Sequence, residues 1–165
     1  MDAPERTATA AGTEPVVKTV TVPLTPKEAF VLFTDDIASW WPLHSYSVAG
    51  DEAVDCRFEP RVGGRLYEVA RDGTESEWGE ILAWEPPARI ELTWHPGDSV
   101  DAQQHLVLGF RAVDGGTELR LEHRGWERLG ERGAAVRESY QSGWDEVLGR
   151  YVGAASGRSG SAQSA

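Results

Sequence analysis

The sequence is poor in sulfur and contains no long hydrophobic run. Cys56 is the single cysteine among 165 residues, which excludes an internal disulfide. No apolar stretch approaches the roughly 20 residues that span a bilayer, so we expect no transmembrane segment and no membrane partner. Residues 1–14 lack the basic and apolar regions of a secretory signal. Together these absences predict a cytoplasmic protein.

Positive charge is scarce as well. The chain has 16 Lys and Arg against 27 Asp and Glu, which gives a formal net charge of -11. Phosphate backbones and anionic lipid headgroups attract clustered basic residues and repel a chain of this charge. Nucleic acid is therefore not an expected partner.

The common motifs of metal and cofactor sites are missing from the sequence. The four histidines, His44, His95, His105 and His123, are scattered, without H-E-x-x-H spacing and without cysteine partners. There is no G-x-S-x-G elbow, phosphate-binding loop or dinucleotide fingerprint. We therefore expect no metal and no cofactor. Cys56 falls in an expected strand, where a small buried residue is more common than a nucleophile.

Length and composition predict a single folded domain with loose ends. Residues 1–14 are small and polar, as in a disordered arm, and residues 153–165 are almost all Gly, Ala and Ser, as in a flexible tail. The segment 15–152 between them is expected to be the domain. Its unusual feature is the chain's seven tryptophans, which indicate either large core rings or an aromatic lining.

Most of the domain is expected to be antiparallel sheet. Val16 to Val22 alternates and is rich in Val and Thr, which is typical of a strand. Turn signals such as Asp72-Gly73 and Asp114-Gly115-Gly116 then recur at near-regular spacing, and connections this short join antiparallel neighbours. The expected strands are 16–22, 52–59, 64–71, 75–84, 89–95, 103–113 and 116–124.

Two short helices and one long helix accompany the strands. Thr25 and Glu28 form a T-x-x-E capping box, and a second short helix is expected from residue 35 to Trp40. Residues 134–152 predict a helix of about five turns. Its apolar stripe is bulky and needs a broad partner surface, which a curved sheet supplies. The stripe consists of Val136, Tyr140, Trp144, Val147, Leu148 and Tyr151.

Alternation along the strands indicates which side chains face the interior. Trp94 belongs to the inward set of its strand, and His123 lies on the apolar face of the last strand. The strand at 75–84 is ambiguous. Trp78 and Glu80 share one face, Ile81 lies on the other, and either face could line the interior.

Several strings in this order and spacing are similar to those of a known family. They are Pro23 to Phe33, Phe58-Glu59-Pro60 with Gly63-Gly64-Arg65, Ile81 to Ile90, Leu92-Thr93-Trp94, and Gly143-Trp144. Over residues 16–152 the chain resembles the START-like, or SRPBCC, helix-grip superfamily, in the branch named after the activator of heat-shock protein 90 ATPase. The resemblance implies an α+β fold in which a curved antiparallel sheet of about seven strands wraps around a long C-terminal helix, with two short helices after the first strand.

The resemblance also implies a cavity between the long helix and the sheet, which relatives use for lipids, polyketides and other apolar molecules. Three hypotheses follow. The protein binds a small hydrophobic or aromatic molecule, or it is a polyketide cyclase- or hydrolase-like enzyme in the same cavity, or it is a co-chaperone-like interaction module. The sequence favours binding over catalysis, assigns no catalytic residue, and leaves a homodimer open.

Ten residues are candidates for the lining of this cavity. His123 would bond a ligand carbonyl or act as a general base, although a satisfied core histidine is more common. Glu80 would be a general acid if it pointed inward, but we favour the outward orientation for its charge. The helix candidates would equally serve a filled core. The ten are Trp40, Trp41, Trp78, Glu80, Trp94, His123, Tyr140, Trp144, Val147 and Leu148.

Overall fold

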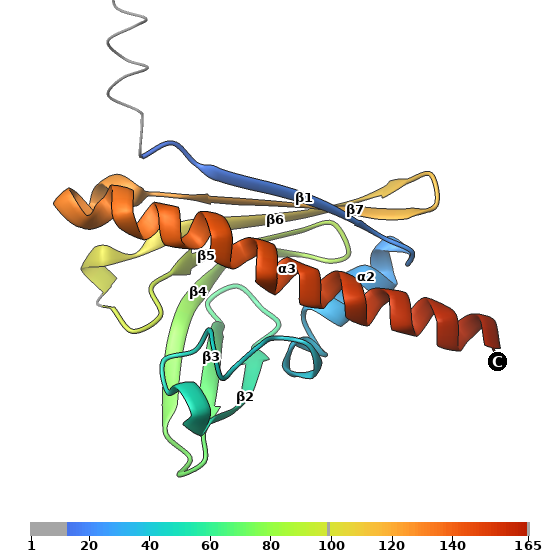
Figure 1. The fold of residues 1–165 in the computed structure, drawn as a ribbon, viewed down its shortest axis with the longest axis horizontal. Coiled ribbons are helices and arrows are strands. Elements are labelled where there is room, and N and C mark those ends of the chain that lie inside the picture. The colour runs from blue at the N-terminus through green and yellow to red at the C-terminus, as the bar shows by residue number, and fades with distance from the viewer. Residues whose placement is uncertain (1–12, 99, 165) are drawn as a thin grey trace, which may run out of the picture.

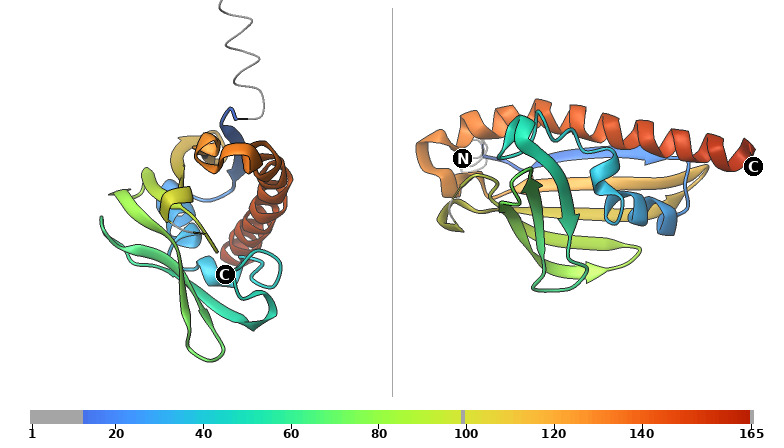
Figure 2. Two further views of the ribbon diagram at one scale, coloured as in Figure 1. Left: turned by 90° about the vertical axis from the view of Figure 1, so that its left-hand side faces the viewer. Right: turned by 90° about the horizontal axis from the view of Figure 1, so that it is seen from below.

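A computed structural model describes residues 13–98 and 100–164. The strands are β1 (Val16–Val22), β2 (Ala53–Phe58), β3 (Arg65–Ala70), β4 (Glu75–Glu85), β5 (Arg89–Trp94), β6 (Gln104–Val113) and β7 (Gly116–Arg124). They form one antiparallel sheet in the order β1-β7-β6-β5-β4-β3-β2, curled around helix α3 (Gly133–Ser164; Figure 1). Figure 2 shows β2 and β3 turning away from β1 and β7, which makes the sheet a half-barrel. The expected α+β helix-grip architecture is confirmed.

Short turns determine which strands are neighbours. Strands β2 to β7 form the expected meander. The last strand, β7, also pairs with the first strand, β1, with Val16 opposite His123. In the turn from β3 to β4, Asp72 Oδ1 accepts the backbone N–H of Thr74 at 2.9 Å, and Gly73 has a φ of 89°. Glycine adopts this left-handed conformation without a steric penalty.

Helix α2 (Pro26–Phe33) packs between the sheet and α3, and begins with the predicted capping box. Thr25 Oγ1 accepts the N–H of Glu28 at 3.2 Å, and Glu28 Oε1 accepts the N–H of Thr25 at 2.9 Å. The ring of Phe33 lies 5.2 Å from that of Tyr151 on α3. The second predicted short helix is a 3-10 turn, η1. The 3-10 turns are η1 (Ile37–Ser39), η2 (Gly50–Glu52), η3 (Val100–Ala102) and η4 (Trp126–Arg132).

Helix α3 continues beyond the end that the sequence pattern predicts. Residues 153–165 are expected to be a flexible tail, yet the helix extends to Ser164. Ala155 is buried in the core, and Nη2 of Arg158 donates to Oδ2 of Asp36 at 2.6 Å. Small residues form no amphipathic stripe in a sequence, but alanine is the best helix former and packs closely. The predicted helix end at residue 152 is therefore wrong, and the bounds of the domain stay a prediction.

The other predicted end is described only in part. Of the expected arm 1–14, residues 1–12 lie outside the described residues, and the backbone carbonyl of Glu14 accepts Nε–H of Arg137 at 2.6 Å. Within residues 13–98 and 100–164, no helix is both long enough and apolar enough to cross a membrane.

Two bulges in β4 decide which of its side chains face the interior. Trp78 is an extra residue opposite β3, and Leu82 is an extra residue opposite β5. A bulge breaks the strict alternation of faces. Trp78 and Ile81 are consequently both buried, whereas Glu80 and Leu82 are exposed. Neither predicted face is the inner one, because each contributes a residue to the interior.

Candidate functional site

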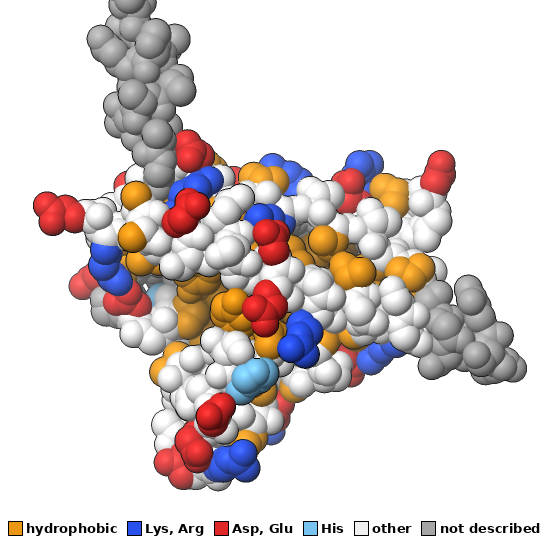
Figure 3. All heavy atoms as spheres, in the orientation of Figure 1, with side chains coloured by type: hydrophobic (Ala, Val, Ile, Leu, Met, Phe, Trp, Pro, Cys, Tyr) orange, Lys and Arg blue, Asp and Glu red, His pale blue; other side chains and the backbone are white. Residues whose placement is uncertain are grey.

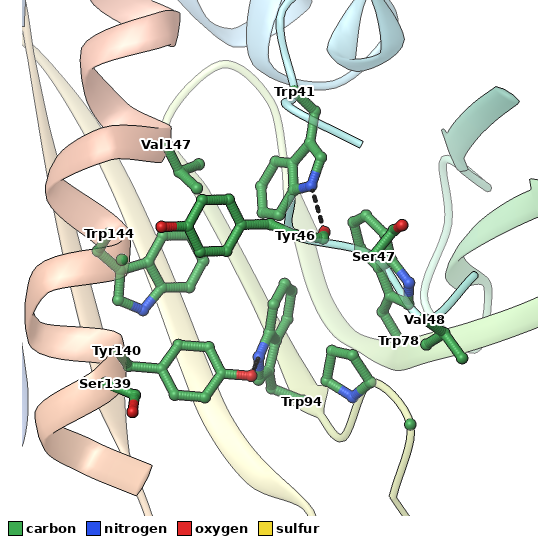
Figure 4. A pocket seen from close by; sticks show the side chains of 13 residues that line it. Trp41, Tyr46, Ser47, Val48, Trp78, Trp94, Ser139, Tyr140, Trp144 and Val147 are labelled. Carbon is green, nitrogen blue, oxygen red and sulfur yellow. Dashed lines mark hydrogen bonds between the residues drawn. The ribbon is translucent and has the colours of Figure 1, made fainter. Parts of the chain in front are cut away.

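A pocket opens between helix α3 and the part of the sheet that turns away from it. Figure 3 shows hydrophobic side chains gathered in this hollow. Its volume is about 500 Å³, which lies in the range of about 300 to 1,000 Å³ that small-molecule sites occupy. The lining residues come from α3, from the loop before β2, from β4 and β5, and from the turn after β5 (Figure 4).

Four tryptophans form the floor of the pocket: Trp41, Trp78, Trp94 and Trp144. The ring centroids of the contacting pairs are 5.0 to 6.2 Å apart. Tilted and edge-to-face packing at this spacing is favourable for aromatic rings. None of the four is more than 7% exposed. The open space therefore lies above the floor, between α3 and the loop that precedes β2.

All four indole N–H groups of the floor are satisfied within the protein. Nε1 of Trp41 donates to the backbone carbonyl of Tyr46 at 2.8 Å (Figure 4), and Nε1 of Trp94 donates to the hydroxyl of Tyr140 at 3.0 Å. The other two bond to buried acceptors beneath the floor. A buried donor without a partner is costly, and here each donor has one. The floor consequently has no free indole donor facing the pocket.

Glu68 on β3 holds one wall of the pocket in place. It is fully buried, and its Oε1 accepts the indole N–H of Trp78 at 2.6 Å. The same carboxylate accepts the backbone N–H groups of Val48 at 2.7 Å and Ala49 at 2.8 Å. Three donors replace the water that a carboxylate loses on burial. Glu68 thereby ties the strap, defined as residues 46–48, to the floor.

The strap meets helix α3 through the side chain of Tyr46. Its ring lies over Gly143, where a Cβ atom would come within 3.2 Å of Cε1. Its hydroxyl donates to Oε1 of Glu146 at 3.2 Å in an exposed position. Figure 4 shows the ring extending from the strap toward helix α3. This side of the pocket is closed by one ring contact and one exposed hydrogen bond.

Six of the ten predicted residues line the pocket. The members on α3 follow helical spacing, which places them on one face, and the others come from the segment after α2 and from β4 and β5. Their role in binding a ligand stays a prediction. The six are Trp41, Trp78, Trp94, Tyr140, Trp144 and Val147.

His123 lies beneath the floor instead of in the pocket. It is fully buried, its Nδ1 accepts the N–H of Trp144 at 3.0 Å, and its Nε2 lies 3.0 Å from Oε1 of Gln104. An indole can only donate, so the proton of the neutral imidazole is on Nε2. Burial lowers the pKa of His123 from 6.5 to about 3. The structure does not place this side chain where a ligand contact or a general base requires it.

Three further predicted residues also lie outside the pocket lining. Glu80 is exposed on the outer face of β4 because of the bulges. Nε1 of Trp40 donates to the carbonyl of Leu32 at 2.9 Å, which holds this ring in the core. Leu148 follows Val147 on α3, and one residue turns a helix by about 100°, so Leu148 packs into the core.

The sequence pattern misses the wall and the mouth of the pocket. The strap residues show no hydrophobic periodicity. The position of the strap depends on hydrogen bonds to Glu68, and the alternation of side chains along β3 does not indicate these bonds. The helical pattern could have predicted two of the missed residues as lining residues, because Ser139 and Gly143 directly precede Tyr140 and Trp144 on α3. The lining residues that the pattern does not predict are Tyr46, Ser47, Val48, Pro96, Gly97, Ser139 and Gly143.

The chemistry of the pocket is aromatic and hydroxylic. Its described lining includes no Asp, Glu, His, Lys or Arg, and its hydroxyl groups belong to Tyr46, Ser47, Ser139 and Tyr140. Burial raises the pKa of Tyr140, so its hydroxyl stays protonated at neutral pH. Burial likewise raises the pKa of the Cys56 thiol, which leaves it unreactive. Among the described residues, no group of three or more His, Cys, Asp or Glu could hold a metal ion.

The family model for Activator of Hsp90 ATPase homolog 1-like protein matches residues 23–152. The chain belongs to this family. The matched segment runs from Pro23, just before α2, into α3 and includes every residue that lines the pocket. No curated protein matches the chain.

Several solved structures are similar to this member of the family. The anthrahydroquino-Gama-pyrone synthase Txn09 complexed with SUM is 32% identical, with a TM-score of 0.61 over 86% of this chain and 97% of that chain. Protein MLL2253 from Mesorhizobium loti is 21% identical, with a TM-score of 0.61 over 84% and 93%. The Aha1 dimer from Colwellia psychrerythraea is 13% identical, with a TM-score of 0.63 over 86% and 95%. The last two show a shared fold.

Proposed function

We propose that this protein binds a planar polycyclic aromatic molecule, such as an aromatic polyketide, between α3 and the strap. The observation that carries the proposal is the floor of Trp41, Trp78, Trp94 and Trp144, whose N–H groups all bond within the protein. Such a floor offers ring surface without competing donors. A flat aromatic ligand matches it by offset or edge-to-face stacking.

A flexible acyl chain would use this pocket less well. Immobilising rotatable bonds costs entropy, whereas a fused ring system has few to lose. Aromatic pairs also gain about 0.5 to 1.5 kcal/mol beyond the burial of their area. The pocket volume of about 500 Å³ suits a molecule of several fused rings. These terms favour a rigid aromatic ligand over a fatty acid.

A ring-forming enzyme that acts on a polyketide-type substrate is the second candidate. It is favoured by the 32% identity to the anthrahydroquino-Gama-pyrone synthase over 86% of this chain. Because the described lining has no carboxylate, imidazole or amine, such an enzyme would hold a reactive conformer against the floor, with the hydroxyl of Tyr140 as proton donor. Binding is common to both candidates and is tested first.

The co-chaperone hypothesis has less support. The Colwellia psychrerythraea Aha1 dimer is 13% identical, and a likeness at this identity supports a shared fold but not a shared binding partner. A filled interior would favour an interaction module, and a pocket of about 500 Å³ favours a ligand instead. The homodimer and the cytoplasmic location stay predictions. Light scattering after size exclusion would test the first, and fractionation of the producing cell would test the second.

Two ligands of different shape test the proposal. Emodin, a planar three-ring quinone, should raise the melting temperature of the protein and quench its tryptophan fluorescence, and palmitate should do neither. A ligand at about 100 times its Kd stabilises the folded state by about 2.7 kcal/mol. Stabilisation by palmitate without stabilisation by emodin would contradict the proposal.

A pair of valines on α3 supplies a matched control. Val147 lines the pocket, whereas Val152 lies on the same helix outside the lining. Val147→Phe places a ring in the pocket and should remove the response to emodin. Val152→Phe makes the same substitution and should keep the response. Equal responses from both variants would place emodin at another site.

A further inference from the structure

We infer that Tyr140 selects ligands that carry an acceptor oxygen, such as a quinone, ketone or pyrone carbonyl, over hydrocarbons of the same shape. The inference rests on the proposed function and specifies the chemistry of its ligand. Its basis is a hydrogen bond that Tyr140 accepts and a proton that it has left to donate.

The hydroxyl oxygen of Tyr140 already accepts a hydrogen bond within the protein. Its oxygen receives the N–H of Trp94 at 3.0 Å, and an indole cannot accept a proton in return. The hydroxyl proton must therefore point elsewhere. Among the described residues, no side chain or backbone carbonyl accepts it, and Figure 4 shows the hydroxyl at the pocket beside Trp94.

The other hydroxyl groups of the pocket are engaged or peripheral. Tyr46 donates to Glu146. Oγ of Ser47 donates to the backbone carbonyl of Gly50 at 3.4 Å and accepts the N–H of Gly50 at 2.9 Å. Ser139 is exposed at the rim. Tyr140 is thus the described lining residue whose free donor lies next to the aromatic floor.

Packing holds this donor in one orientation. The ring of Tyr140 lies 4.7 Å from His123 and 5.5 Å from Trp126, both of which are fully buried. Burial raises the pKa of Tyr140, so the proton is present at neutral pH. A donor that is already oriented loses little freedom when a ligand accepts its proton.

A ligand that covers the hydroxyl without accepting its proton leaves a buried donor unpaired. Sites built to bond a polar group reject analogues that lack it, because the unpaired group has lost its water. One net hydrogen bond corresponds to about a tenfold change in affinity. A carbonyl at this position should therefore be preferred over a methylene by about that factor.

Fluorene and 9-fluorenone differ only by a methylene and a carbonyl on the same planar skeleton, so fluorescence titration with each compares the two groups directly. The unmodified protein should bind 9-fluorenone about tenfold more tightly. Tyr140→Phe should bind the two probes equally. Trp94→Phe also removes the bond between Trp94 and Tyr140 but keeps the hydroxyl, so it should retain the preference even where both affinities fall.

The infrared carbonyl band of bound 9-fluorenone gives a second readout on the unmodified protein. A hydrogen bond from Tyr140 should lower its frequency below the value in hexane, and an unshifted band would overturn the inference even if Tyr140→Phe failed to fold. Equal binding of the two probes by the unmodified protein, or a preference that survives Tyr140→Phe, would also overturn it. Failure of both probes to bind would instead contradict the proposed function on which the inference rests.

Discussion

The indole N–H of Trp144 donates to Nδ1 of His123 at 3.0 Å, and neither residue is more than 2% exposed. The other imidazole nitrogen bonds to Gln104. A histidine on the sheet thereby orients a ring that lines the pocket, without contacting the pocket itself. The same arrangement recurs at Trp78 above Glu68.

His123 makes the stability of the protein depend on pH. Burial lowers its pKa from 6.5 to about 3, so the unfolded chain binds a proton that the folded chain does not. The stabilisation is fully present above pH 6.5 and is lost as the pH falls toward 3. Each pH unit in that window should cost about 1.4 kcal/mol from this one group. Urea unfolding at several pH values measures the slope.

His123→Asn removes the titrating group while its amide oxygen can still accept from Trp144. The variant should be less stable than the parent at pH 7, and its free energy of unfolding should fall less steeply between pH 6 and pH 4, by about one proton. Parallel curves for parent and variant would show that His123 is not the source of the slope.

Glu68→Gln should loosen the strap. The carboxamide nitrogen cannot accept, so at least one of the three N–H groups that Glu68 now receives is left without a partner, at a cost of about 1 to 3 kcal/mol. The amide protons of Val48 and Ala49 should exchange faster with solvent, as measured by NMR. Glu80→Gln is the control on the outer face of β4 and should change stability by less than about 0.5 kcal/mol.

Gly143→Ala tests the seat of Tyr46 on α3. The new methyl group would lie 3.2 Å from Cε1 of Tyr46, and the ring should shift because only an exposed hydrogen bond retains it. Gly149→Ala, with no atom within 4 Å of its Cβ position, should stabilise the helix by about 0.5 to 1 kcal/mol. Gly143→Ala should increase helix stability less than Gly149→Ala does. It should also release emodin faster than Gly149→Ala in stopped-flow displacement. Equal stability and equal release in the two variants would exclude a role for the Tyr46 contact.

The last turns of α3 contribute to stability through Ala155. Ala155→Asp buries a carboxylate without a partner and should cost at least about 3 kcal/mol. Ser156 is exposed on the same turn, and Ser156→Asp should change the free energy of unfolding by less than about 0.5 kcal/mol. Chemical denaturation of both variants measures the difference, and equal values would mean that this segment is not packed on the core.

Local patterns predict the fold because each element is specified by its own residues. Thr25 and Glu28 determine the start of α2, Asp72-Gly73 forms a hairpin turn, and the stripe on α3 has one helical period. These signals involve residues that are close in sequence, so they can be recognised without knowledge of the tertiary structure. The order of the elements then leaves few ways to cover the bulky face of α3.

The rest depends on contacts between distant segments. The bulges of β4 accompany a close approach to β5, where a Cβ at Gly79 would lie 1.7 Å from the carbonyl oxygen of Thr93. The strap is placed by Glu68, and the end of α3 by the burial of Ala155. The hydrophobic periodicity of the sequence does not indicate such contacts. The ring stripe is therefore predictable from the sequence, whereas the wall opposite it and the displacement of His123 from the pocket are not.

The indole region of a ¹H–¹⁵N NMR spectrum tests the aromatic pocket most directly. The chain has seven tryptophans, of which Trp41, Trp78, Trp94 and Trp144 line the pocket and Trp40, Trp84 and Trp126 do not. Titration with 9-fluorenone should shift the four lining signals through ring currents and leave the other three nearly in place. Unchanged lining signals, or shifts confined to the other three, would contradict ligand binding on this floor.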